Sequence, residues 1–321
     1  MMKKYWLITL SLVLLLSAAL LTAASCNLVQ RPTANTTVTQ VSCNAQRAST
    51  TSSGSPTTTN QCSRRLLVFS KTGGFRHASI KDGKIALQKL ATEHNFSVDF
   101  TEDATAFTDV NLAHYDAVVF LLTTGKMLDD NQKAAFERYI RAGGGYVGVH
   151  SASDTEYAWS WYGGLLGAYF DRIHGHSKVV RATIHVIDRN HPSTLMLPVF
   201  WVRTDEWYNF ASNPRGKVNV LMTIDESTYK GGAMGADHPI AWYHEYDGGR
   251  AWYTALGHTS ESYSEPLFLA HLWGGILYAS GGTRKEATLS RAVEERDMKF
   301  LVGSMTVDNV TKRNLECLKC G

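Results

Sequence analysis

The segment from Arg65 to Gly282 contains no cysteine, although the chain of 321 residues has five. Thiol-dependent catalysis needs a cysteine, whose thiolate is the nucleophile, so this segment cannot carry it out. It also has no Gly-x-Ser-x-Gly and no His-Glu-x-x-His sequence, the local signatures of a serine hydrolase and of a zinc protease. A catalytic site in this segment therefore has to be assembled from residues that no short motif brings together.

A concentrated basic surface is absent as well. The chain has 32 Lys and Arg against 29 Asp and Glu, a net charge of +3, and its basic residues form no stripe or helical cluster. Nucleic-acid binding depends on such a cluster because phosphate contacts supply most of the affinity. The sequence thus gives no support for a nucleic-acid partner.

The first 25 residues have the layout of a secretory signal peptide. A lysine pair precedes an apolar run from Leu7 to Leu21, and small residues follow up to Ser25. This pattern predicts export, with the protein secreted or at the cell surface. Two alternatives tether it to a membrane: the apolar run stays as an anchor, or Cys26 carries a lipid, since the residues before it are similar to a bacterial lipoprotein cleavage box.

Composition divides the rest of the chain into three parts. Residues 26–64 are rich in Ser and Thr and poor in large apolar residues, which predicts a flexible linker. Residues 65–282 are long enough for one well-packed domain. Residues 283–321 form a charged tail with a Cys-x-x-Cys sequence at Cys317 and Cys320. Together with Cys43 and Cys62 they are four cysteines, an even number. Disulfides persist outside the cytoplasm, so in an exported protein we expect disulfides and not a zinc site or a redox pair.

Hydrophobic patterning within residues 65–282 alternates between strands and helices in the first half. Apolar runs at 66–69 and 115–122 and the alternating residues 96–100 are typical of strands, and helical periodicity follows each of the two apolar runs. This alternation predicts a parallel sheet. Later, residues 179–187 and 218–224 are also typical of strands, and residues 240–246 and 250–256 flank Asp247-Gly248-Gly249, which indicates a hairpin. We expect an α/β fold with a doubly wound, mostly parallel sheet, an added antiparallel hairpin and a final apolar helix over residues 266–279.

The strand expected before His150 ends in a group of polar residues. Asp154, Glu156, His174 and His176 follow within one short stretch. In an open α/β sheet ligands bind beyond the carboxyl ends of the strands, so His150 is expected at a crevice. The alternative is that His150 is a buried structural residue, whose side chain only forms hydrogen bonds within a packed turn.

Several sequence pieces across residues 66–282 together resemble the trehalose-utilisation, or ThuA-like, domain family. They are TGGFRH at 72–77, GVHSASD at 148–154, residues 170–176, DEWY at 205–208, DHPIAW at 237–242 and GHT at 257–259. The resemblance implies the class I glutamine amidotransferase-like fold, with its flavodoxin-like sheet. In those amidotransferases a nucleophilic cysteine follows the corresponding strand, and His150 stands in its place here. The chain is therefore not expected to be a cysteine-dependent glutamine amidotransferase.

The resemblance and the side-chain chemistry together assign candidate roles. The candidates are His150, His258, Asp154 and Glu206 for catalysis, His77, Trp207, Tyr208 and His238 for substrate binding, and His150, His174 and His176 as the metal ligands of first choice. The wider set from which a metal site could draw adds His77, Glu206, His244 and His258, with Asp154 and Asp205 as ligands or as residues that orient them. Imidazole serves either as a general base or as a ligand. The site is thus an acid/base site, with His150 as base and His258 as acid, or one that holds a divalent ion such as zinc.

The resemblance implies carbohydrate metabolism, of trehalose-like disaccharides or their 3-keto derivatives. We expect an exported hydrolase or lyase that cleaves or rearranges a keto-glycoside, with a small carbohydrate as its partner. The alternative is a non-catalytic sugar-binding module tethered to the cell surface. The 8 Trp and 14 Tyr residues would suit either, because aromatic rings offer apolar faces to sugars.

Overall fold

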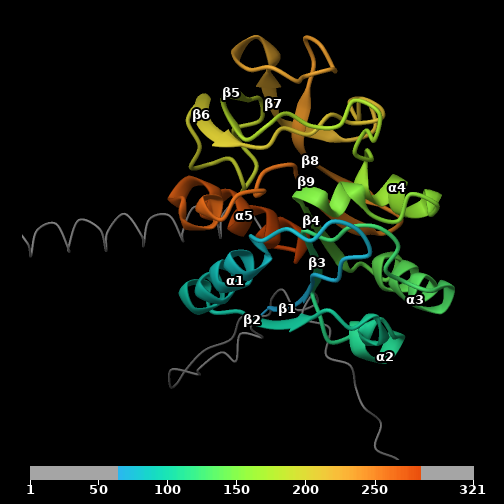
Figure 1. Cartoon of the computed structure of the whole chain (residues 1–321). Helices are drawn as coiled ribbons and strands as arrows, with labels where there is room; N and C mark the ends of the chain where they lie inside the picture. Colours follow the sequence, from blue (N-terminus) through green and yellow to red (C-terminus); the bar gives the residue numbers. More distant parts are fainter. Residues whose placement is uncertain (1–63, 283–321) are drawn as a thin grey trace, which may run out of the picture. The chain divides into compact units, whose positions relative to one another are not determined.

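The computed structural model describes residues 64–282 (Figure 1). The expected signal peptide, the linker up to residue 63, Cys26 and the tail with Cys317 and Cys320 lie outside the described residues. Among the residues that are described, no helix has the length and apolar character needed to cross a membrane.

Within residues 64–282, nine strands form a single sheet in the order β2-β1-β3-β4-β9-β8-β7-β5-β6. The first five in this order pair in parallel: β2 (Ser97–Thr101), β1 (Arg65–Phe69), β3 (Ala117–Leu121), β4 (Gly145–Val149) and β9 (Gly249–Thr254). The remaining pairs are antiparallel, through β8 (Pro239–Tyr246), β7 (Asn219–Asp225), β5 (Val180–Val186) and the edge strand β6 (Phe200–Asp205). The fold is mixed α/β, with a large sheet whose core is mostly parallel.

Helices cover both faces of the parallel half (Figure 1). On one face lie α1 (Ile80–His94) and α5 (Pro266–Ala279), and on the other α3 (Asp130–Arg141) and α4 (Ser160–Leu166), with α2 (Asp109–Leu112) beside α3. Strand β3 is buried along its whole length, as a strand between two helical layers must be. Helix α3 begins with a capping box, in which Asp129 accepts from the Gln132 amide and the Gln132 side chain accepts from the Asp129 amide.

The predicted parallel strands, the hairpin of β8 and β9 and the apolar helix α5 are confirmed. The strands predicted at 179–187 and 218–224 are confirmed as β5 and β7. The antiparallel part is larger than the predicted hairpin, because β7, β5 and β6 also belong to it. Strand β6 was missed. Its residues alternate between exposed and buried, as on an edge strand with one face in solvent, and its sequence ends in a polar run that reads as a loop.

The antiparallel half lies over the start of helix α5, with β6 above α5 in Figure 1. The Trp201 indole N–H donates to Glu265 Oε1 at 3.1 Å, immediately before α5. Asp205, at the end of β6, accepts from the backbone amides of Gly257 and His258. These contacts bring β6, five positions from β4 in the sheet order, back toward the carboxyl ends of the parallel strands. The residues after β6 can therefore share a site with those after β1, β4 and β9.

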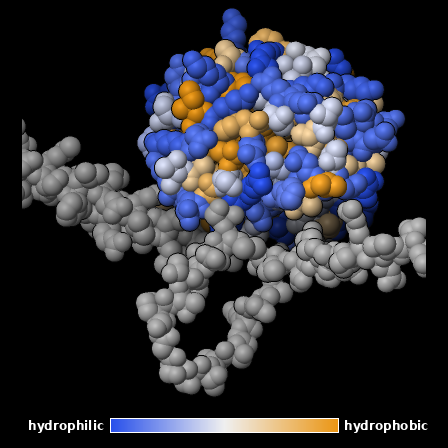
Figure 2. All heavy atoms as spheres, turned by 90° about the horizontal axis from the view of Figure 1, so that it is seen from below, coloured by the Kyte–Doolittle hydropathy of each residue, from blue (hydrophilic) through white to orange (hydrophobic). Residues whose placement is uncertain are grey.

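Hydrophobic side chains on the underside of Figure 1 are interspersed with hydrophilic ones (Figure 2). Val110 in α2 and Ile85 in α1 are among the described apolar residues whose side chains are exposed to solvent. Such single exposures are ordinary on a folded domain.

Two buried histidines near α5 predict that the domain loses stability in mild acid. Burial is the main cause that lowers the pKa of His191 and of His271 from 6.5 to about 3. Between these values the unfolded chain binds the protons and the folded domain does not. Stability is therefore full above about pH 6.5 and falls below it, by about 1.4 kcal/mol per pH unit for each histidine.

Urea unfolding between pH 7 and pH 4.5 tests this expectation. We expect the midpoint to fall with pH in the native protein and more gently in a His191→Gln variant, whereas replacing the exposed His114 should leave the slope unchanged. A midpoint that stays constant down to pH 4.5 would show that the burial of these two imidazoles has no linkage to folding.

Candidate functional site

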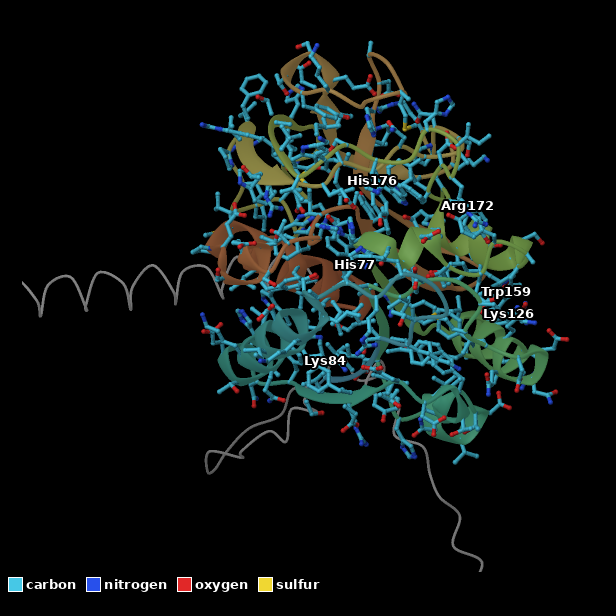
Figure 3. The ribbon with its side chains drawn as sticks, in the orientation of Figure 1. His77, Lys84, Lys126, Trp159, Arg172 and His176 are labelled. Carbon is cyan, nitrogen blue, oxygen red and sulfur yellow. The ribbon has the colours of Figure 1, made fainter. Side chains whose placement is uncertain are left out.

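Four side chains meet at the carboxyl ends of the parallel strands, and we call them the His/Glu cluster: His77, His150, Glu206 and His258. One ligand-type atom from each lies within 4.8 Å of the others. His258 Nδ1 is 3.0 Å from Glu206 Oε2 and 3.2 Å from His150 Nε2. His150 Nε2 is 3.4 Å from Glu206 Oε2. Figure 3 labels His77 near the middle of the front face, with His176 close above it.

His150 is held rigidly at the end of β4. Its φ of 50° lies in the left-handed region, which few residues other than glycine adopt. The Tyr253 hydroxyl donates to the His150 carbonyl at 2.8 Å. His150 Nδ1 lies 2.7 Å from the Ala255 carbonyl oxygen, which can only accept, so Nδ1 carries the hydrogen. The lone pair of the neutral ring is then on Nε2, which faces the cluster.

Asp205 fixes the two other segments of the site to each other. Its carboxylate is fully buried and accepts from the backbone amides of Glu206 at 3.0 Å and His258 at 3.1 Å. The other oxygen accepts from the Gly257 amide at 2.9 Å and lies 3.3 Å from Arg203 Nη2. One carboxylate therefore positions both Glu206 and His258, which are far apart in the sequence.

His176 and His174 differ in their relation to the cluster. His176 Nδ1 donates to the Ser177 carbonyl at 2.7 Å and lies 2.9 Å from Glu206 Oε1, whereas Glu206 Oε2 faces His150 and His258. His174 is 59% exposed and pairs with Asp171. Of the three histidines predicted as metal ligands of first choice, only His150 belongs to the cluster.

The other predicted site residues lie around the cluster. The Asp154 carboxylate accepts from the Tyr157 hydroxyl at 2.7 Å, and the Tyr208 ring packs on His150 with centroids 4.2 Å apart. Trp207 and His238 are fully buried, with Trp207 Nε1 donating to the Val180 carbonyl and His238 held by Glu226 and the Tyr208 carbonyl. Because both side chains are buried and bond to backbone carbonyls, Trp207 and His238 hold the backbone around the site and do not face a substrate.

The charge of the cluster is centred on Glu206, whose carboxylate lies among the imidazoles. Burial, followed by the neighbouring His150 and His258, lowers the pKa of His77 to about 3, so its ring is neutral. Burial opposes ionisation of Glu206, but hydrogen bonds from His150 and His258 outweigh it and hold the pKa of this carboxyl well below its usual range. Burial likewise opposes protonation of His258, yet its hydrogen bond to Glu206 raises its pKa overall.

Comparison with known proteins identifies the domain. Residues 65–279 match the ThuA family, described as trehalose utilisation. This chain belongs to the ThuA family. None of the curated proteins matches it.

Two solved structures share the fold of this ThuA domain. A ThuA-like protein of Bacteroides uniformis superposes with a TM-score of 0.59 at 22% identity, over 72% of this chain and 99% of its own. A ThuA-like protein of Parabacteroides merdae superposes with a TM-score of 0.55 at 19% identity, over 69% and 91%. At these identities the likeness extends to the fold alone.

The donor atoms of the ThuA domain fit a divalent metal ion. Ligands around a tetrahedral zinc ion, at bonds of 2.0–2.1 Å, lie about 3.3 Å apart, close to the 3.0, 3.2 and 3.4 Å between the atoms of His258, His150 and Glu206. Three imidazoles and one carboxylate suit zinc, and they also suit manganese or iron.

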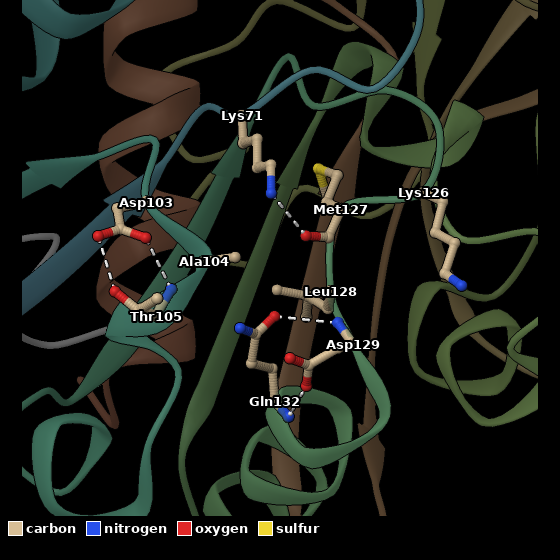
Figure 4. Close-up of a pocket in the computed structure, with 9 residues that line it drawn as sticks. All are labelled: Lys71, Asp103, Ala104, Thr105, Lys126, Met127, Leu128, Asp129 and Gln132. Carbon is tan, nitrogen blue, oxygen red and sulfur yellow. Dashed lines mark hydrogen bonds between the residues drawn. The ribbon is translucent and has the colours of Figure 1, made fainter.

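A separate pocket of about 410 Å³ lies beside the loops after β1, β2 and β3 (Figure 4). None of the four cluster residues lines it. Lys71 Nζ donates to the Met127 carbonyl at 3.1 Å, and Lys126 lies apart from the other lining side chains in Figure 4. Because its polar groups bond to one another and do not converge on a common point, we do not assign this pocket a function.

Sequence reasoning placed His77 among the substrate contacts and did not foresee how it is held. His77 Nδ1 lies 3.4 Å from Ser151 Oγ, and its ring contacts those of both His150 and His258. Arg203, three positions before Glu206, contacts Asp205 and Glu265. The TGGFRH and GHT pieces were the only sequence signal for these contacts.

Proposed function

We propose that this protein is a metal-dependent enzyme that cleaves a carbohydrate, and that its substrate is a keto-glycoside. The observation that carries the proposal is the convergence of His77, His150, Glu206 and His258 within 4.8 Å. A sugar-binding module that performs no chemistry would have no need for three imidazoles and a carboxylate directed at one point. The ThuA family, described as trehalose utilisation, supports the substrate class.

The four cluster residues would hold the ion, and the residues around them orient the ligands. The Ala255 carbonyl fixes the tautomer of His150, and His176 holds one oxygen of Glu206, as supporting hydrogen bonds do in metal sites. When bound, such an ion polarises a carbonyl oxygen and stabilises the negative charge that develops on it. Because His150 and His258 are ligands in this proposal, another residue has to transfer the proton.

His176 is the side chain placed to transfer it. Its Nδ1 is committed to Glu206 and Ser177, and its ring is 46% exposed beside the cluster. In a 3-keto-glycoside, His176 Nε2 would take the proton from the carbon next to the carbonyl. The electron pair left behind forms a carbon–carbon double bond as the glycosidic carbon–oxygen bond breaks. His176 then returns the proton to the departing oxygen.

Two further features complete the proposal. The order β2-β1-β3-β4-β9 of the parallel strands supports a flavodoxin-like, class I glutamine amidotransferase-like arrangement, in which ligands bind beyond the carboxyl ends of the strands. The layout of residues 1–25 supports export, so the enzyme would meet its substrate outside the cytoplasm, either secreted or tethered through Cys26 or the apolar segment.

Release of nitrophenol from 4-nitrophenyl 3-keto-β-D-glucopyranoside tests the proposed reaction. We expect turnover by the metal-loaded full chain, and a decrease in kcat of at least about 100-fold in a His176→Ala variant that keeps its metal, because a positioned base contributes at least that factor. The exposed His185 provides the control, whose replacement by alanine should leave kcat unchanged. Full activity in the His176→Ala variant would remove His176 from the reaction.

A further inference from the structure

Phe75 is a large aromatic residue that the fold leaves in solvent. It lies in the loop between β1 and α1, and its side chain is 67% exposed. An exposed phenylalanine forgoes the hydrophobic stabilisation that burial would give it. Single exposures of this kind are common, so the meaning of Phe75 depends on how it is held and on what lies beside it.

The loop that carries Phe75 is hydrogen-bonded to Thr124, in the loop after β3. The Gly73 amide donates to the Thr124 carbonyl at 2.6 Å, and Thr124 Oγ1 donates to the Phe75 carbonyl at 2.8 Å. A Cβ atom on Gly73 would come within 2.6 Å of the Lys126 carbonyl oxygen, so only glycine permits this approach. The Phe75 backbone is therefore held in place while its ring stays in solvent.

The ring lies beside the His/Glu cluster. Its centroid is 4.9 Å from that of His77, with the planes at 85°. The centroid of His77 is in turn 5.1 Å from that of His258, whose side chain is 23% exposed while that of Glu206 is 8% exposed. Phe75 is thus separated by one imidazole ring from the accessible side of the cluster.

We infer that Phe75 is a stacking platform for the apolar face of a pyranose ring, which positions the sugar against the cluster. A pyranoside has one face of C–H groups and an edge of hydroxyls. Stacking of that face on a rigid aromatic ring is favourable and loses little entropy, because the loop is already ordered. The polar edge would then point toward His258. This inference rests on the proposed function in that it takes a carbohydrate as the ligand.

Calorimetric titration of the full, metal-loaded chain with trehalose and with methyl β-D-glucopyranoside tests the platform. We expect a Phe75→Ala variant to bind about tenfold more weakly, and Phe75→Tyr, which keeps the ring, to bind as the native protein does. Val110, 78% exposed in α2, supplies the matched control, and Val110→Ala should leave binding unchanged. The metal content of each variant is measured in parallel and should not differ.

Two results would overturn the platform: unchanged affinity in Phe75→Ala, or no binding of either sugar to the native protein. Failure of the proposed function has a different signature. Sugar binding that depends on Phe75, in a protein that holds no metal and turns over no keto-glycoside, would support the platform and contradict the enzyme.

Discussion

Replacing Glu206 by alanine should abolish tight metal binding and, with it, turnover of keto-glycosides. Glu206 is the only carboxylate of the His/Glu cluster, and its charge is what balances a divalent ion among neutral imidazoles. We expect the zinc affinity to fall by more than about 100-fold, since loss of a supporting residue alone costs 10–100-fold. Calorimetric titration of the metal-free protein with zinc measures this directly.

The matched control is Glu93→Ala, in which an exposed carboxylate paired with Lys89 is removed. Its zinc affinity should equal that of the native protein. If the Glu206→Ala variant bound zinc as tightly as the control, the cluster would not be the metal site and the ligand assignment would have to be abandoned.

Replacing Asp205 by asparagine should weaken both the fold and the site. The Asp205 carboxylate accepts three backbone amide hydrogen bonds from Glu206, Gly257 and His258, and it lies against the buried guanidinium of Arg203. An amide cannot accept at both of its positions and carries no charge. Arg203 keeps its ion pair with Glu265, but the buried backbone amides that face the new NH2 group lose their acceptor. We therefore expect a loss of about 3 kcal/mol in the free energy of unfolding.

The same substitution should lower the metal affinity by about 10–100-fold, because Asp205 positions two ligands without touching the ion. Asp237→Asn is the control. Asp237 pairs with Arg215 on the surface, and such pairs contribute only about 0–1 kcal/mol. Urea unfolding and zinc titration of both variants separate the two effects. Equal stability and equal zinc affinity in the two variants would show that Asp205 has no special role.

The parallel half of the sheet could be predicted from the sequence because its signals are local. Strands β1 and β3 are short apolar runs, and the hairpin of β8 and β9 carries its own turn residues at Asp247 and Gly248. The same logic placed His150 at the end of β4. These predictions need only the pattern within a few residues and the rule that ligands bind beyond the carboxyl ends of strands.

All four cluster residues were candidate ligands, but which of the candidates meet could not be predicted in the same way. Glu206 reaches the site only because β6 lies back over the start of α5, through contacts such as that of Trp201 with Glu265. The sequence of residues 200–206 contains no pattern that predicts the contact between β6 and the start of α5. His174 and His176 flank a glycine and look equivalent in sequence, yet Gly175, with a φ of 66°, turns the chain so that only His176 contacts Glu206.

The central claim is that His77, His150, Glu206 and His258 bind a metal ion, and the metal content of the purified protein tests it most directly. The full chain and its His150→Ala variant would be prepared without a polyhistidine tag and measured by inductively coupled plasma mass spectrometry. The account predicts about one divalent ion per native chain and its loss in a variant that keeps the native circular dichroism spectrum. A native protein that holds no metal, and takes up neither zinc nor manganese when they are added, would contradict it.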